Sequence, residues 1–153
     1  MKEKYMKEAI KEALKANDKL EVPIGAIIVK DEKIIARAHN LRESKKNAVA
    51  HAEILAIEKA CKKLDAWRLN DCDIYITLEP CAMCAGAILN SRIRNVYIGA
   101  SEPRSGAAGS KINIFEDYEY NHKVNYESGI LEEECREILQ KFFKNRRKEK
   151  ERC

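Results

Sequence analysis

Four residues of this chain have the types and spacing that metal-assisted hydrolysis needs. His51 and Glu53 stand two positions apart, and Cys81 and Cys84 follow later in a Pro-Cys-x-x-Cys run. One imidazole and two thiolates leave the fourth position of a tetrahedral zinc ion open for a water molecule. Glu53 is too close to His51 in sequence to bind the same ion and is placed to move the proton of that water. We therefore expect a catalytic zinc site with these three ligands, one zinc ion per chain, and Glu53 as its acid and base.

A Cys-x-x-Cys pair is also found in two other kinds of site, a redox-active dithiol and a structural zinc site. After a buried strand it is also typical of thiol oxidoreductases, in which Cys81 and Cys84 would alternate between dithiol and disulfide. A structural zinc site would need a fourth protein ligand. The joint presence of His51 and Glu53 favours the catalytic site over both alternatives. No second spaced pair is formed by the remaining cysteines, which are Cys61, Cys72, Cys135 and Cys153.

Length and composition predict one enzyme domain that spans residues 1–153. No apolar run approaches the roughly 18 residues of a membrane span, and the charged start of the chain lacks the apolar centre of a signal peptide. We therefore expect a cytoplasmic protein with no membrane partner. In that compartment its cysteines should be reduced thiols. His39 and His122 have no partner in sequence and are expected to be surface or hydrogen-bonded residues.

The elements that must position these residues follow from the apolar periodicity. Helical spacing predicts helices near residues 6–14, 50–64 and 80–89 and from residue 130 onwards. Short apolar runs predict strands, the first two joined as a hairpin, at residues 25–29, 34–38, 74–78, 96–99 and 123–126. This order predicts an α/β fold, a three-layer α/β/α sandwich around a mixed five-stranded sheet.

That arrangement places the expected ligands at two helix starts. His51 and Glu53 fall in the first turn of one helix, and Pro80 is expected to open the next. Cys81 and Cys84 then share one face of the first turn. The unpaired N–H groups and the positive dipole end there lower the pKa of a thiol toward the thiolate that binds zinc.

The basic excess of the chain lies at its C-terminus. Residues 141–153 hold seven Lys or Arg against two Glu, whereas residues 1–140 carry a net charge of −1. Such a stretch is most often the solvated end of a helix, but it is also typical of a surface that binds phosphate. The last helix is expected to turn from apolar to basic as it leaves the core, which favours RNA as the substrate. Its expected buried stripe consists of Ile138, Leu139, Phe142 and Phe143, followed by Arg146 and Arg147.

Longer runs surround these residues, at 22–26, 39–40, 50–54, 77–87, 91–93 and 106–110. The His-x-Glu and Pro-Cys-x-x-Cys pair is the signature of the zinc nucleobase deaminases. With these runs the chain resembles the bacterial tRNA-specific adenosine deaminases, a branch of the cytidine-deaminase-like superfamily. The Gly-Ala-Ala-Gly-Ser run at 106–110 and the C-terminal helix distinguish this branch from the wider superfamily.

The resemblance implies conversion of the wobble adenosine of a tRNA anticodon to inosine. It also implies a homodimer with one zinc ion per subunit, with contacts to the anticodon arm shared between the subunits. Asn40 is the implied contact to the flipped-out base. Glu102 and Arg104 stand where the family usually has Asp and Lys. These residues carry the same charges as the usual ones, but their side chains differ in length. Further substrate contacts are expected at Val22, Pro23, Ala52, Arg104, Phe143, Lys144, Arg146 and Arg147.

The chemistry of such a site is a hydrolysis. Zinc lowers the pKa of a bound water to about 7, and Glu53 carries its proton to N1 of adenine as the oxygen attacks C6. An adenine inside a stack cannot present C6, so the substrate must be single-stranded or extruded. A deaminase of a free base or nucleoside, of the guanine or cytosine type, would use the same zinc core and is the alternative function.

Overall fold

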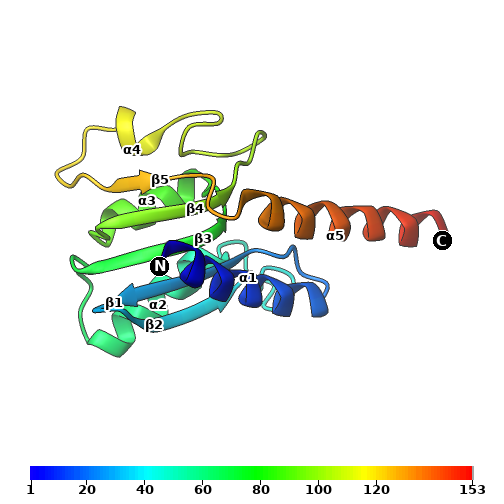
Figure 1. Ribbon diagram of the computed structural model, residues 1–153, viewed down its shortest axis with the longest axis horizontal. Coiled ribbons are helices and arrows are strands. Elements are labelled where there is room, and N and C mark those ends of the chain that lie inside the picture. Colours follow the sequence, from blue (N-terminus) through cyan, green and yellow to red (C-terminus); the bar gives the residue numbers. More distant parts are fainter. Residues whose placement is uncertain (153) are drawn as a thin grey trace.

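A mixed five-stranded sheet forms the middle layer of the molecule (Figure 1). The computed structural model describes residues 1–152. β1 pairs antiparallel with β2 and β3, whereas β3, β4 and β5 run parallel to one another. In spatial order the strands are β2 (Lys33–His39), β1 (Gly25–Lys30), β3 (Cys72–Leu78), β4 (Asn95–Ala100) and β5 (Asn125–Glu127).

Helices cover both faces of this sheet and complete the predicted three-layer sandwich. α1 (Lys2–Asp18) and α5 (Glu132–Arg152) pack on one face. α2 (Ala52–Leu64) and α3 (Ala82–Asn90) pack on the other, with the short α4 (Ile114–Asp117) beside α3. Side chains of β3 point alternately to the two faces of the sheet and so contribute to both apolar cores. Ile74 and Ile76 belong to one core and Tyr75 to the other.

The predicted hairpin is confirmed. β1 and β2 are joined through Asp31 and Glu32, whose φ angles of 50° and 62° match the left-handed pair that a tight hairpin turn needs. At the other end of β1, a Cβ on Gly25 would overlap Ala9 O and lie 2.6 Å from Ala13 N. Glycine there lets α1 lie directly on the sheet, which fixes the segment between α1 and β1 beside the site described below.

α5 leaves the sheet partway along its length, and its last turns project beyond the body of the molecule (Figure 1). Leu139 and Phe142 are buried and Ile138 is half-buried, as the predicted stripe requires. Phe143 is 46% exposed, so its assignment to the buried stripe is wrong. The residue next to Phe142 lies about 100° further round the helix and faces away from the sheet.

The loop between β4 and β5 contains the unpredicted α4. Asn113 caps this helix by accepting a hydrogen bond from Glu116 N at 3.3 Å. Four residues are too few to show helical periodicity in a sequence. Over residues 1–152, no helix has both the length and the apolar character that crossing a bilayer demands.

Candidate active site

The expected metal ligands lie at the N-termini of α2 and α3. His51 is the N-cap of α2, Cys81 is the N-cap of α3, and Cys84 follows in the first turn of α3. The sequence predicts Pro80 as the opening residue of this helix, but the extended backbone of Cys81 (φ −75°, ψ 176°) starts α3 at Ala82. Two positive helix ends therefore converge on one cluster, where they favour anionic ligand atoms.

The three side chains have the spacing of zinc ligands. His51 Nδ1 lies 3.5 Å from Cys84 Sγ and 3.8 Å from Cys81 Sγ. All three donor atoms lie within 4.8 Å of one another. A tetrahedral zinc ion with bonds of about 2.0 Å to nitrogen and about 2.3 Å to sulfur separates such ligands by about 3.5 Å. The residues present therefore fit zinc in both donor type and distance.

The two thiols are electrostatically unequal. A hydrogen bond from Cys84, aided by His51, lowers the pKa of Cys81 to about 3 despite its partial burial. The same hydrogen bond and the burial of Cys84 raise the pKa of the Cys84 thiol. The hydrogen bond to Cys81 also raises the pKa of His51. Cys81 is thus held as a thiolate, which is the form of cysteine that binds metal ions.

Glu53 lies beside this cluster, shielded from solvent. Its side chain, in the first turn of α2, is 4% exposed and lines the same pocket as His51 and Cys81. Burial raises the pKa of Glu53 to about 7. A carboxyl group with a pKa near the ambient pH can both accept and release a proton, as an acid–base catalyst must.

A pocket of about 810 Å³ opens over Glu53 and is surrounded by basic side chains. Arg136 is engaged by Glu132 and Glu133 of its own helix. Among the side chains of residues 1–150, the other basic residues of the pocket form one ion pair, between Arg146 and Glu149 at 3.6 Å. Cationic side chains at the mouth of a pocket suit a substrate that carries several phosphates. These basic lining residues are Arg104, Arg136, Arg146, Arg147 and Lys150.

A second pocket of about 620 Å³ shares His51 and Phe143 with the first and is lined by Asn40. The Asn40 amide donates to Val22 O at 3.2 Å and accepts from Arg42 N at 3.1 Å. An amide offers two N–H donors and two lone pairs. Asn40 therefore keeps one donor and one acceptor that a base could use.

Most of the residues expected to contact substrate come together around these pockets. Three of them do not line either pocket: Pro23 and Ala52 are buried, and Lys144 is exposed on α5. Cys84 is fully buried and belongs to the cluster as a ligand. The predicted residues that do line them are Val22, Asn40, His51, Glu53, Cys81, Arg104, Phe143, Arg146 and Arg147.

Sequence reasoning missed two buried carboxylates that hold the loops around the pockets. Glu21 is 1% exposed and accepts hydrogen bonds from Glu43 N and Ser44 N. Glu79 is 5% exposed and accepts hydrogen bonds from the loop after β4. Burial alone would raise the pKa of each, but the hydrogen bonds outweigh it and lower both pKa values. A glutamate at a helix end or a strand end resembles solvated surface in a sequence, so neither residue was assigned a role, although Glu79 lies within the run at 77–87.

The two remaining histidines are hydrogen-bonded, as expected. His39 Nδ1 lies 3.0 Å from Glu12 Oε1, and His122 Nε2 lies 2.8 Å from Ile93 O, so both rings are hydrogen-bonded within the fold. Cys153 lies outside the described residues. Free thiols are found at Cys61, Cys72, Cys81, Cys84 and Cys135.

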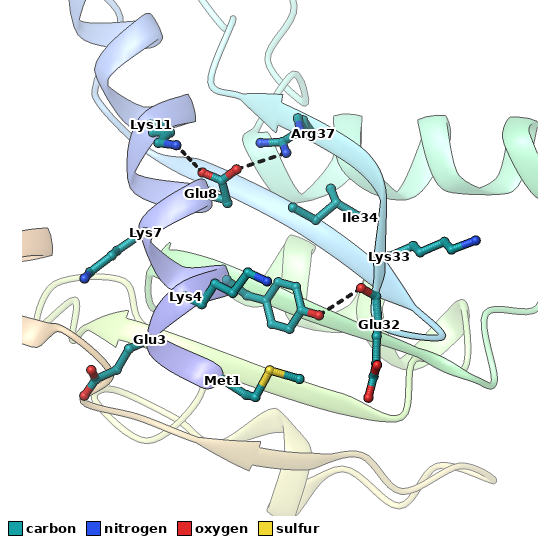
Figure 2. A pocket seen from close by; sticks show the side chains of 11 residues that line it. Met1, Glu3, Lys4, Lys7, Glu8, Lys11, Glu32, Lys33, Ile34 and Arg37 are labelled. Carbon is teal, nitrogen blue, oxygen red and sulfur yellow. Dashed lines mark hydrogen bonds and ion pairs between the residues drawn. The ribbon is translucent and has the colours of Figure 1, made fainter.

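A separate depression of about 830 Å³ lies between α1 and the β1–β2 hairpin (Figure 2). Several of its polar groups pair with one another: Glu8 pairs with Lys11 and Arg37, and the Tyr5 hydroxyl donates to Glu32 O. In the described part of the chain the potential metal ligands cluster elsewhere, at His51. The depression therefore lacks the chemistry of the pocket over Glu53.

Comparisons with known proteins agree with this site. Residues 1–147 match the family model of the MafB19-like deaminases. The chain is 53% identical over 148 residues to the tRNA-specific adenosine deaminase of Bacillus subtilis (strain 168), covering 97% of this chain and 92% of that relative. A solved structure from work on A-to-I editing by tRNA:A34 deaminases at the wobble position of transfer RNA superposes with a TM-score of 0.86 at 44% identity, covering 88% of this chain and 98% of that one. The guanine deaminase of Bacillus subtilis superposes with a TM-score of 0.63 at 43% identity, over 65% of this chain and 64% of that one.

Proposed function

Because this chain belongs to the MafB19-like deaminase family and, within it, to the tRNA-specific adenosine deaminases, we propose that it converts the wobble adenosine of a tRNA anticodon to inosine. The reaction is a hydrolysis in which water adds at C6 of adenine and the exocyclic amine leaves as ammonia. One observation carries the proposal. A cluster that fits zinc and a buried glutamate lie together in a pocket with a basic rim.

The residues of the cluster divide the chemistry between them. Zinc held by His51, Cys81 and Cys84 would lower the pKa of a water to about 7 and so supply a nucleophile at neutral pH. Glu53 takes a proton from this water and passes it to N1 of adenine while C6 becomes tetrahedral. The Glu53 carboxylate then takes the proton of the new hydroxyl and gives it to the departing amine. Its burial keeps bulk water from competing for these protons.

The pocket lining supports an RNA loop as the substrate. Asn40 offers its unused donor and acceptor to the extruded base. Phe143, exposed where the two pockets meet, provides an aromatic face on which a neighbouring base can stack. Arg104, Arg146 and Arg147 contact backbone phosphates. An anticodon loop is already largely unpaired, so extruding its adenosine costs little free energy.

We also propose that the protein is a homodimer. It acts in the cytoplasm, where its tRNA substrate is found. Met83 is 36% exposed and Val49 is 46% exposed. Met83 lies in α3 and Val49 just before α2, the two helices whose starts carry the metal ligands. Exposed apolar side chains such as these support burial against a second copy. Sedimentation velocity measures the assembly, and Met83→Glu should shift it toward monomer.

Incubation with unmodified tRNA, followed by sequencing for A-to-G changes, tests the reaction. A change confined to the wobble position is expected, and it should disappear with Glu53→Ala. Free adenosine, guanine and cytosine are assayed in parallel for ammonia release. Deamination of guanine with no change in tRNA would instead support a free-base deaminase, like the Bacillus subtilis protein that shares 43% identity over 65% of this chain.

A further inference from the structure

Glu79 directs all of its side-chain hydrogen bonds to a single loop. The residue follows β3 and stands two positions before Cys81. Its Oε1 accepts from Glu102 N at 3.0 Å and from Ser110 Oγ, and its Oε2 accepts from Ala108 N at 2.9 Å and Ser110 N at 3.0 Å. One buried carboxylate thus joins the two ends of the loop at residues 102–110.

Residues 106–108 of this loop pack tightly against the segment that carries Cys81. A Cβ on Gly106 would overlap Glu79 Oε2 and lie 2.5 Å from Glu102 O. Ala107 N donates to Pro80 O at 2.8 Å. The run from 106 to 108 is buried. A small displacement of the Glu79 carboxylate would therefore be passed to the loop.

Residues 103–105 of the same loop are exposed and line the pocket over Glu53. Pro103, Arg104 and Ser105 face solvent at this rim. Arg104 N donates to Glu102 Oε1 at 2.9 Å, which places it next to one of the anchored N–H groups. The position of the Arg104 side chain over the pocket therefore depends on the anchored groups on either side of it, at Glu102 and at 106–110.

We propose that Glu79 is a positioning residue that fixes the 102–110 loop, and through Arg104 the affinity for RNA, without taking part in the chemistry at the adenine. The inference rests on the RNA substrate of the proposed function. A carboxylate is needed because all four partners are donors. A glutamine would point its own N–H groups at the partners of one oxygen and leave at least one backbone N–H unpaired.

Glu79→Gln tests this role, with Asp73→Asn as the matched control. Asp73 lies near the opposite end of β3, and its carboxylate accepts hydrogen bonds from Arg94 and Asn95. Glu79→Gln should raise KM for tRNA about tenfold, as expected for a buried donor left unpaired, while kcat changes less than about threefold. Zinc should stay at one per chain. Asp73→Asn should leave KM unchanged.

Hydrogen exchange gives a readout that needs no substrate. The amides of Ala108 and Ser110 should exchange at least about tenfold faster in Glu79→Gln, with β3 and β4 unaffected. Ser110→Ala keeps the carboxylate and removes one donor, so it should shift KM and exchange in the same direction by less. It carries the test if Glu79→Gln does not fold.

Two results would overturn the role of Glu79, and a third would overturn the proposed function on which its link to RNA rests. Unchanged KM and exchange would mean that Glu79 does not hold the loop. Loss of zinc, or a fall in kcat at constant KM, would assign Glu79 to the metal site. Absence of tRNA deamination in the unsubstituted protein would refute the proposed function, and the exchange data would still report whether Glu79 holds the loop.

Discussion

Cys84 Sγ lies 3.5 Å from His51 Nδ1, so the starts of α2 and α3 meet at one cluster of metal-binding atoms. Cys84 is fully buried, and solvent cannot replace its thiolate. Cys84→Ala should therefore lose zinc. It should also lower the free energy of unfolding by more than about 2.7 kcal/mol, the stabilisation that a ligand provides at 100 times its Kd. Metal analysis and denaturant unfolding measure the two effects.

Cys72→Ala is the matched control for that variant. Cys72 is 1% exposed in β3 and lies outside the metal cluster. Its substitution should cost about 1 kcal/mol, a common value for a point mutation, and leave zinc content unchanged. A Cys84→Ala protein that still binds one zinc ion per chain would remove Cys84 from the ligand set.

Glu53→Ala should separate catalysis from metal binding. The variant should keep zinc, while kcat falls by about 10²- to 10⁴-fold because the proton carrier is lost. Burial of a carboxyl group opposes folding, so the melting temperature should stay constant or rise. Glu58→Gln, an exposed change on the same helix, should alter neither activity nor melting temperature. Near-normal turnover of Glu53→Ala would show that another residue moves the proton.

The sequence predicts the metal cluster well because zinc chemistry restricts the residue types. Few patterns other than His-x-Glu with Pro-Cys-x-x-Cys supply three donors and a proton carrier. The helix starts were less predictable, because a cap depends on backbone angles rather than on residue type alone. Cys81 has extended angles and begins α3 after Pro80, although proline also fits a first helical turn.

The burial of Glu79 and the exposure of Phe143 depend on tertiary contacts, which a single sequence does not reveal. Glu79 is charged but buried, and only the approach of residues 102–110 supplies its hydrogen-bond donors. Phe143 continues an apolar pattern along α5, yet it is exposed and lines the pocket. The pattern identified a helix with an apolar face, but it could not show where that face leaves the sheet.

Glu12 predicts how stability depends on pH. It is 3% exposed on α1 and pairs with His39 at 3.0 Å and Lys15 at 2.7 Å. Burial alone would raise its pKa, but these hydrogen bonds outweigh burial and lower the pKa of Glu12. The pairing therefore stabilises the fold above the ordinary pKa of 4.5, and this stability is lost as the pH falls through the native pKa.

Glu12→Gln should cost about 1–3 kcal/mol at pH 7, because charged hydrogen bonds to a buried group are lost. The difference from the unsubstituted protein should shrink as the pH falls below 4.5. Urea unfolding between about pH 3 and pH 7 measures both. A difference that stays constant over this range would mean that Glu12 is not the group that titrates.

The basic end of α5 should supply part of the RNA affinity. Replacing Lys144, Arg146 and Arg147 with alanine should weaken tRNA binding. It should also lower the slope of log affinity against log salt by up to about 0.7–0.9 for each phosphate contact removed. Only the two arginines line the pocket, so Arg146→Ala/Arg147→Ala should account for most of the change. Zinc content should not change, and kcat at saturating tRNA should fall far less than affinity.

Lys62→Ala/Lys63→Ala is the charge-matched control for this arginine pair. Both lysines are in the last turn of α2, at the opposite end of that helix from His51. Their removal should change neither the affinity nor the salt slope, since they lie away from the pockets. If the arginine pair behaves like this control, residues 146 and 147 only solvate the end of α5. The phosphate contacts would then lie elsewhere on the pocket rim, at Arg104 and the 102–110 loop.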